Sequence, residues 1–287
     1  MSVVTTEGKW TTALRNIQRP SVSLSLIGLI ASGLVVLIVI GWLGWPGLFT
    51  SYSPIDGTTV QRLQPPGSAH WFGTDHQGRD VYARVVYGAS KTIGGAAIAI
   101  VIGLFGGLIL GVVAATAGGW IESVVMRIVE VLLAIPAILV ALCLVSAFGP
   151  GVVQIAVAIG VHSIAVFTRL ARSRVLEVRE SEYVEAAALV ASGYWSIMFR
   201  HVLPNSAGPV VALLAIEFAN AVLSIGALGF LGYGALPPTP EWGVIISDGR
   251  GYLANAWWIS LLPSLVLVLV VLAFNRISSV IEEKGNF

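Results

Sequence analysis

Residues 90–116 read SKTIGGAAIAIVIGLFGGLILGVVAAT and carry one charged side chain, Lys91, in 27 positions. A helix needs about 20 mostly apolar residues to cross the hydrocarbon core of a bilayer, so this stretch is predicted to be a transmembrane helix. Gly103, Gly107 and Gly111 recur at every fourth position. That spacing lets two membrane helices approach closely, and we expect the glycines to serve helix packing. A flexible helix lining a pore is the alternative.

Apolar blocks of similar length make the whole chain a predicted membrane protein. They are residues 23–45, 123–147, 151–171, 208–231 and 256–277. The composition agrees, because the chain is 56% hydrophobic and only 11% charged, whereas soluble domains carry roughly 25% charged residues. We therefore expect an all-α membrane protein with six transmembrane helices. A formal net charge of +1 gives no sign of nucleic-acid binding, and a single cysteine excludes an intramolecular disulfide and a cysteine-rich metal site.

The six blocks divide the chain into an N-terminal segment, a first helix, a loop, a five-helix core and a tail. The boundaries are 1–22, 23–45, 46–89, 90–280 and 281–287, and the core contains a polar loop at 172–207. About twenty mostly polar residues precede the first apolar block, so a cleavable signal peptide is not expected.

The distribution of lysine and arginine predicts the orientation. Six spans place both termini on one side, and if that side is cytoplasmic, eleven basic residues lie inside and five outside. The inner set is Lys9, Arg15, Arg19, Arg127, Arg169, Arg172, Arg174, Arg179, Arg200, Arg276 and Lys284; the outer set is Arg62, Arg79, Arg84, Lys91 and Arg250. The excess follows the positive-inside rule, so both termini and the 172–207 loop are predicted to be cytoplasmic. Residues 46–89 and 232–255 then face outward.

The inner loop contains the segment EAAALVASGYWSIMFRHVLP, residues 185–204. Ser181 is suited to cap a helix whose first turn carries acidic side chains, including Glu185. Ser192-Gly193 breaks the pattern, a second amphipathic helix follows, and Pro204 is expected to end it. The segment is predicted to form two short helices joined at a glycine hinge.

This segment resembles the EAA loop of ABC importer permeases, which docks on the ATPase subunit. The matching residues are Glu185, Ala186, Ala187, Leu203 and Pro204. The family usually has glycine where this chain has Ala191, and here the nearby glycine is Gly193, so the hinge is expected to be shifted by two residues.

Residues 72–80, FGTDHQGRD, resemble a signature of the C-type permeases of dipeptide, oligopeptide and nickel importers. Together the two motifs identify a resemblance to that family over nearly the whole chain after about Ser21. The resemblance implies the type I ABC importer permease fold in a bacterial inner membrane. It further implies a heterodimer with a second permease, two ATPase subunits that bind ATP and Mg, and an extracytoplasmic binding protein that delivers peptide.

The outer loops hold a second group of candidate residues. Asp75 is expected to cap a short helix near His76, while Arg79 and Asp80 offer ion pairing. A stiff proline run beside Trp242 is expected to form a lip at the pore mouth, and Trp242 is a candidate outer-loop contact. For these residues, contact with a delivering receptor or partner permease and a self-satisfied folded loop remain open alternatives.

Ionisable side chains inside membrane spans are energetically costly, so they are treated first as candidate functional residues. Glu217 and Asn220 lie three residues apart in the fifth block and so on one helical face. We expect that face to line the translocation path; a hydrogen bond to a helix of the partner subunit is the alternative. Arg127 and Glu130 are expected to pair, and His162 is expected to be a packing residue.

Catalytic and metal-binding patterns are missing from the sequence, so the chain is expected to be a non-catalytic pore subunit without a cofactor or metal of its own. A secondary transporter would need repeats with ion ligands at the middle of the membrane. An intramembrane enzyme would need a nucleophile and a base at one depth, and neither alternative requires a docking segment. Dipeptides or oligopeptides are the favoured substrates, with nickel chelates and glutathione-like solutes as alternatives within the same family.

Overall fold

The computed structural model describes residues 22–179 and 203–284, and its regular elements are all helical. The helices are α2 (Val22–Gly44), α3 (Val81–Ala117), α4 (Gly119–Ala134), α5 (Ala137–Phe148), α6 (Val152–Arg179), α9 (Leu203–Phe230), α10 (Trp242–Asp248) and α11 (Trp258–Lys284), with short 3-10 turns η2 (Pro46–Leu48), η3 (Thr59–Gln61) and η5 (Arg250–Tyr252). Five helices of this described part are long and apolar enough to cross a membrane, or six spans if the bent pair α4 and α5 counts as one. This architecture confirms the all-helical prediction.

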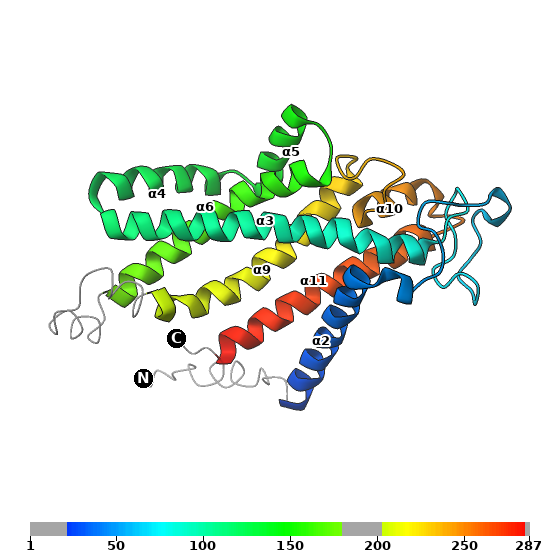
Figure 1. Ribbon diagram of the computed structural model, residues 1–287, viewed down its shortest axis with the longest axis horizontal. Coiled ribbons are helices and arrows are strands. Elements are labelled where there is room, and N and C mark those ends of the chain that lie inside the picture. Colours follow the sequence, from blue (N-terminus) through cyan, green and yellow to red (C-terminus); the bar gives the residue numbers. More distant parts are fainter. Residues whose placement is uncertain (1–21, 180–202, 285–287) are drawn as a thin grey trace, which may run out of the picture.

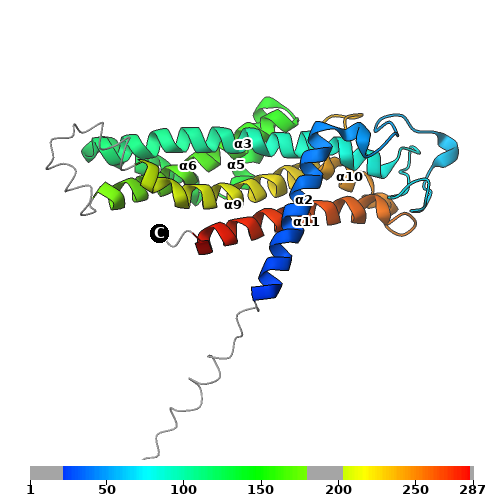
Figure 2. The ribbon, with the colours of Figure 1, turned by 60° about the horizontal axis from the view of Figure 1, so that its bottom comes forward.

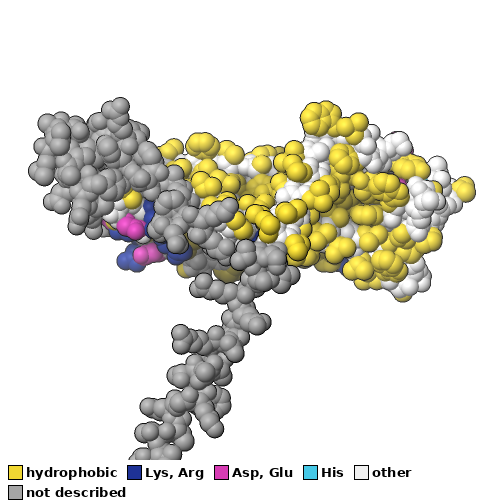
Figure 3. All heavy atoms as spheres, turned by 90° about the horizontal axis from the view of Figure 1, so that it is seen from below, with side chains coloured by type: hydrophobic (Ala, Val, Ile, Leu, Met, Phe, Trp, Pro, Cys, Tyr) yellow, Lys and Arg dark blue, Asp and Glu magenta, His cyan; other side chains and the backbone are white. Residues whose placement is uncertain are grey.

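The long helices α3, α6, α9 and α11 form an elongated bundle, and α2 crosses it obliquely against α11 (Figures 1 and 2). The α2–α3 connection and the segment from α9 through α10 to α11 lie together at one end of the bundle (Figure 1, right). We call residues 45–80 together with residues 231–257 the cap. Hydrophobic side chains dominate the flank seen in Figure 3, and charged side chains gather towards the end opposite the cap. An apolar flank of this kind suits contact with lipid.

The glycine repeat of α3 is the seam on which α6 packs. A Cβ added at Gly103 would lie 2.5 Å from the Cβ of Ser163, and one at Gly111 would lie 2.7 Å from the Cβ of Ala171. Side chains larger than hydrogen therefore do not fit between these helices without movement. The close pairs are Gly103–Ser163, Gly107–Phe167 and Gly111–Ala171. The predicted packing role of these glycines is confirmed.

Helix α3 begins nine residues before the predicted block, because Asp80 caps it. The Asp80 carboxylate Oδ1 accepts a hydrogen bond of 2.6 Å from the backbone N–H of Ala83. The helix has 37 residues and is about 55 Å long at 1.5 Å per residue, well beyond the hydrocarbon thickness. Its first turns therefore lie beside the cap, and the loop predicted at 46–89 ends at Asp80.

The third predicted span is not one continuous helix. Helices α4 and α5 meet at an angle of 91° around Ile135 and Pro136. Proline lacks the N–H that a helix interior needs and forces its predecessor into extended geometry, and Ile135 has φ −97° and ψ 127°. The block predicted at 123–147 is therefore a bent pair of helices, which makes a sixth span if the pair is counted as one. The predicted pair of Arg127 and Glu130 does form, at 3.3 Å between exposed side chains.

The ends of α6 and α9 also differ from the prediction. Helix α6 continues to Arg179, eight residues beyond the predicted block, so the polar loop at 172–207 begins as helix. Helix α9 begins at Leu203, with Pro204 in its first turn, where a proline lacks no bond that the helix requires. Pro204 was predicted to end the preceding segment, and in the structure it lies in the first turn of α9. The two ends lie near each other at the end of the bundle opposite the cap (Figure 1).

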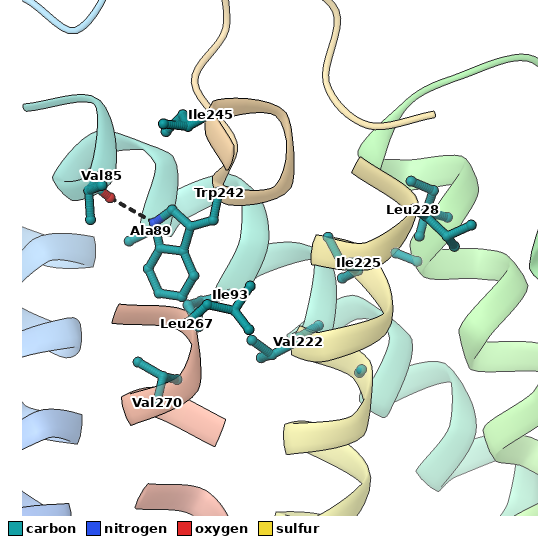
Figure 4. Close-up of a cluster of buried hydrophobic side chains, with 14 of the residues drawn as sticks. Val85, Ala89, Ile93, Val222, Ile225, Leu228, Trp242, Ile245, Leu267 and Val270 are labelled. Atoms are coloured by element: carbon teal, nitrogen blue, oxygen red, sulfur yellow. Dashed lines mark hydrogen bonds between the residues drawn. The ribbon is translucent and has the colours of Figure 1, made fainter. Parts of the chain in front are cut away.

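The core beneath the cap is built around Trp242. Figure 4 shows its indole pointing into a cluster of side chains from α3, α9 and α11. The indole N–H donates a 2.8 Å hydrogen bond to the carbonyl oxygen of Val85, and the side chain is fully buried. Trp242 is thus a core residue that holds α10 against α3, and the prediction that it is an outer-loop contact was wrong, because its side chain is fully buried.

Candidate functional site

The predicted coupling segment is only partly described by the structure. Glu185, Ala186, Ala187, Ala191 and Gly193 lie outside the described residues, and the backbone of Leu203 and Pro204 forms the start of α9.

The helices that lead into and out of this segment are firmly anchored at its end of the bundle. Arg179, the last residue of α6, donates a 3.1 Å hydrogen bond to the carbonyl oxygen of Ala115 in α3. Arg172 in α6 donates from Nε to the carboxylate of Glu122 in α4 at 2.7 Å. Helix α6 also packs along α9. Movement applied between α6 and α9 would therefore reach α3 and α4 as well.

A polar cluster joins α6 and α9 inside the bundle. The Glu217 carboxylate accepts hydrogen bonds from the Ser163 hydroxyl at 3.1 Å and from the Asn220 amide at 3.3 Å. Ser163 is buried, Glu217 is half-buried and Asn220 is exposed. His162 lies beside this cluster, and its Nδ1 is buried without a hydrogen-bond partner among the described residues.

The Glu217 carboxylate is bonded to a helix of its own chain, so pore lining and a hydrogen bond to the partner subunit both stay predictions. Glu217 makes a hydrogen bond between helices, and Asn220, on the same face, is open. A carboxylate accepts about four hydrogen bonds, so Glu217 retains acceptor capacity towards that open side. The contribution of Ser163 was missed, because a serine in an apolar helix carries no distinctive pattern.

An ion network ties the cap together around Asp75. The fully buried Asp75 carboxylate accepts from Arg79 Nε at 2.7 Å, from Arg84 Nη1 at 2.6 Å, and from the backbone N–H groups of Gln77 and Arg79 at 2.8 and 3.0 Å. Asp248, at the end of α10, lies 3.3 Å from Arg84 and 3.7 Å from Arg79. The network therefore joins the loop, α3 and α10.

The charges of this network are balanced. Burial alone would raise the pKa of Asp75, but the guanidinium groups of Arg84 and Arg79 and the two backbone N–H donors hold it below its usual value. Of the two alternatives, the geometry favours the self-satisfied loop for Asp75 and Arg79, whose buried side chains pair with each other; Asp80 is also buried, and its carboxylate contacts the Ala83 N–H and His70. No helix begins at His76, since Asp75 closes a turn instead, and the prediction that it caps one there was wrong.

A second buried carboxylate, Glu241, fixes the start of α10. It accepts hydrogen bonds from the backbone N–H groups of Gly243 at 2.8 Å and Val244 at 3.3 Å, and from the Thr92 hydroxyl at 3.3 Å. Burial raises the pKa of Glu241 to about 7, against the lowering effect of those hydrogen bonds. The sequence analysis named its neighbour Trp242 but missed Glu241. An acidic residue just before a short apolar run is the signal of a helix cap that would have identified it.

The described polar side chains of these sites make hydrogen bonds and ion pairs. Within the described ranges 22–179 and 203–284, no group of three or more His, Cys, Asp or Glu side chains is arranged to hold a metal ion. The buried polar groups instead join helices to each other. They fix the geometry of the described bundle, and the Glu217 cluster lies between its helices α6 and α9.

Residues 107–284 match the model of a family described as the inner-membrane component of binding-protein-dependent transport systems. The chain belongs to this family. It is 38% identical to a dipeptide transport system permease protein of Alkalihalophilus pseudofirmus, over 93% of this chain and 86% of the relative. It is 35% identical to a glutathione transport system permease protein of Pectobacterium atrosepticum, over 86% of this chain and 82% of the relative. The matched residues include all of α6, α9 and α11.

Solved structures of ABC transporters share the fold at lower sequence identity. An amino acid ABC transporter matches with a TM-score of 0.57 at 16% identity, covering 71% of this chain and 94% of that one. The inward-facing methionine transporter MetNI matches with a TM-score of 0.55 at 21% identity, covering 69% of this chain and 95% of that one. The helical bundle is thus that of a type I ABC importer permease.

Proposed function

We propose that this permease is one of two membrane subunits of an ATP-driven importer of dipeptides or oligopeptides. The observation that carries the substrate class is the 38% identity to a dipeptide transport permease over 93% of the chain. A relative in Escherichia coli described as a probable D,D-dipeptide permease, 34% identical over 84% of the chain, supports the same class.

ATP hydrolysis in this proposal belongs to partner subunits. Two ATPases bind ATP and Mg at the cytoplasmic side, a second permease completes the pore as a heterodimer, and an extracytoplasmic binding protein delivers the peptide. Residues 181–204 dock on an ATPase. The anchors of α6 on α3 and α4 supply a physical route by which that docking moves the bundle, because packed helices shift as rigid elements.

The proposed orientation places both termini and the coupling segment in the cytoplasm and the cap outside. The excess of basic residues on the inner side supports it.

The proposed translocation path runs along the face of α9 that carries Glu217 and Asn220. The exposed amide of Asn220 and the spare acceptor capacity of Glu217 suit the N–H groups and the ammonium group of a peptide. Ser163 holds the carboxylate from behind, so its orientation is set before a substrate arrives.

Glutathione is the second candidate substrate, because a glutathione transport permease is 35% identical over 86% of this chain. Glutathione is itself a tripeptide with one γ-linkage, so it presents the same amide and ammonium groups. Discrimination between the two requires the delivering binding protein, since both substrates satisfy the same polar cluster.

Uptake by the reconstituted complex tests the proposal. The complex retained with this chain is placed in proteoliposomes, and uptake of radiolabelled dialanine and glutathione is measured with and without ATP and binding protein. We expect uptake of dialanine that depends on both. Uptake without ATP, or of neither substrate, would contradict the proposal.

A further inference from the structure

Two adjoining cavities lie at the cap, and none of the residues of the ion network around Asp75 lines them. The first has a volume of about 240 Å³ and is lined by the aromatic side chains of Phe49, Tyr52, Trp71 and Tyr82. The second has a volume of about 190 Å³ and is lined mainly by polar residues, among them Asp56, His70 and Gln61. Tyr52 and Asp80 line both cavities. The space suits a group the size of one amino-acid residue, since sites for larger ligands exceed about 300 Å³.

A buried carboxylate lies where the two cavities meet. Asp80 is 4% exposed, with Oδ1 accepting from the Ala83 N–H at 2.6 Å and Oδ2 lying 2.7 Å from His70 Nδ1. Each carboxylate oxygen can accept a second hydrogen bond, so these contacts hold the carboxylate in place and leave it able to accept further hydrogen bonds.

The electrostatics of the cavities favour a cation. Among the described residues that line them there is no lysine or arginine, while Asp56 adds a second carboxylate. The neighbouring arginines, Arg79 and Arg84, are occupied by Asp75 and Asp248. The positive N-terminus of α3 and the His70 ring, 2.7 Å from Asp80, offset part of the Asp80 charge, and Asp80 and Asp56 are the carboxylates of the lining.

The aromatic walls suit the same ligand. The rings of Trp71 and Tyr82 lie 5.0 Å apart at an angle of 50°, and Tyr52 lies 4.9 Å from the His70 ring. Trp71 is 63% exposed and Tyr52 is 44% exposed, so ring surface remains open. Aromatic faces attract ammonium and guanidinium groups within about 6 Å of the ring centre.

From this geometry we infer that the cap holds a binding site for a primary ammonium group, with Asp80 as the counter-ion and Tyr52, Trp71 and Tyr82 as the aromatic walls. The identity of the ammonium group as that of an arriving peptide rests on the proposed function. In the proposed orientation, the site lies at the outer end of the bundle, where substrate would enter. It would hold the amino terminus of a peptide before the peptide enters the path along α9.

Ligand-observed NMR on the full chain in lipid nanodiscs tests this site without requiring transport. Saturation transfer is measured for n-butylamine, for dialanine, for N-acetyl-dialanine and for Nα-acetyl-lysine amide, with empty nanodiscs as the blank. We expect saturable binding of the three compounds that carry an ammonium group and at least tenfold weaker binding of N-acetyl-dialanine. Tighter binding of dialanine assigns the site to a peptide amino terminus, and tighter binding of the lysine compound assigns it to a lysine side chain; both support an ammonium site.

Matched variants locate the binding. Asp80→Asn removes the charge, but asparagine caps helices as well as aspartate does, so the fold is expected to survive. Tyr52→Leu removes an aromatic wall and leaves the carboxylate, and Val60→Ser, at a position that is 90% exposed and lines neither cavity, is the control. We expect Asp80→Asn to weaken binding at least tenfold, Tyr52→Leu to weaken it severalfold, and Val60→Ser to leave it unchanged. Equal binding by wild type and both cavity variants, or no binding by wild type, would overturn the inference, whatever the transport assay shows.

Discussion

Removing the charge of Asp75 should destabilise the cap more than any surface change. The Asp75→Asn side chain keeps its size, but its amide group turns donors towards Arg79 and Arg84, whose guanidinium nitrogens lie 2.7 and 2.6 Å from the carboxylate. The two guanidinium groups would then share only Asp248, which is 30% exposed. Breaking a buried pair by removing one partner costs about 3–5 kcal/mol.

Thermal unfolding in detergent micelles is the assay. At roughly 2–4 °C per kcal/mol for a chain of this size, the Asp75→Asn change predicts a fall in Tm of about 6–20 °C. Glu177→Gln is the matched control, because its pair with Arg174 spans 2.8 Å but leaves Glu177 61% exposed. Exposed pairs of this kind contribute about 0.5 kcal/mol or less, so the control should lower Tm by no more than about 2 °C.

Two further results test the reasoning. The double variant Asp75→Asn with Arg84→Met should lose less stability than the sum of its single variants, because the second change removes one of the unpaired charges. The folded-state pKa of Asp75 lies below its unfolded value of 3.8, so its contribution is present above that pH and is lost as the pH falls through the folded value. A Tm fall under about 3 °C for Asp75→Asn, or additive losses in the double variant, would refute the account of the network.

Three other predictions concern the seam, the second buried carboxylate and the coupling segment. Gly107→Ala should cost about 1–3 kcal/mol of stability by overpacking against Phe167, whereas Gly94→Ala in the same helix, with no heavy atom within 4 Å of the added carbon, should be neutral or slightly stabilising in the same unfolding assay. Because burial raises the pKa of Glu241 from 4.5 to about 7, the wild type should lose up to about 3 kcal/mol of stability as the pH rises from 4.5 to 7. The Glu241→Gln variant should remove most of this dependence of stability on pH. An unchanged slope of Tm against pH in that variant would refute the role of Glu241. Glu185→Lys should abolish substrate-driven ATP turnover in the reconstituted complex by reversing a charge in the docking segment, and normal turnover would contradict that role.

Local patterns were sufficient to predict the helices and their closest packing. The four-residue repeat of Gly103, Gly107 and Gly111 predicted a helix seam, because absent side chains at that spacing always share a helical face. The start of α3 was missed, because Arg84 marked the stretch as a polar loop. In the structure Asp75 neutralises the charge of Arg84, and this pairing allows residues 81–89 to be helical.

Contacts between residues far apart in the sequence could not be predicted from the sequence. Arg84 contacts Asp248, which lies 164 positions away in the sequence, and the residues around each of them give no sign of the pair. Ser163 and Glu217 are joined by the packing of α6 on α9, which periodicity does not specify. The bend at Pro136 was available in principle, but apolar residues on both sides outweighed the proline in the span prediction. The candidate site of the cap follows from such distant contacts and so appears only in the structure.

Affinity purification of the tagged chain from native membranes in mild detergent, followed by quantitative mass spectrometry, tests the central claim most directly. If the chain is a pore subunit driven by partners, a second six-span permease and ATPase chains should be retained with it in fixed ratio. Recovery of the chain alone, still active in proteoliposomes without ATP, would contradict the account and favour a secondary transporter.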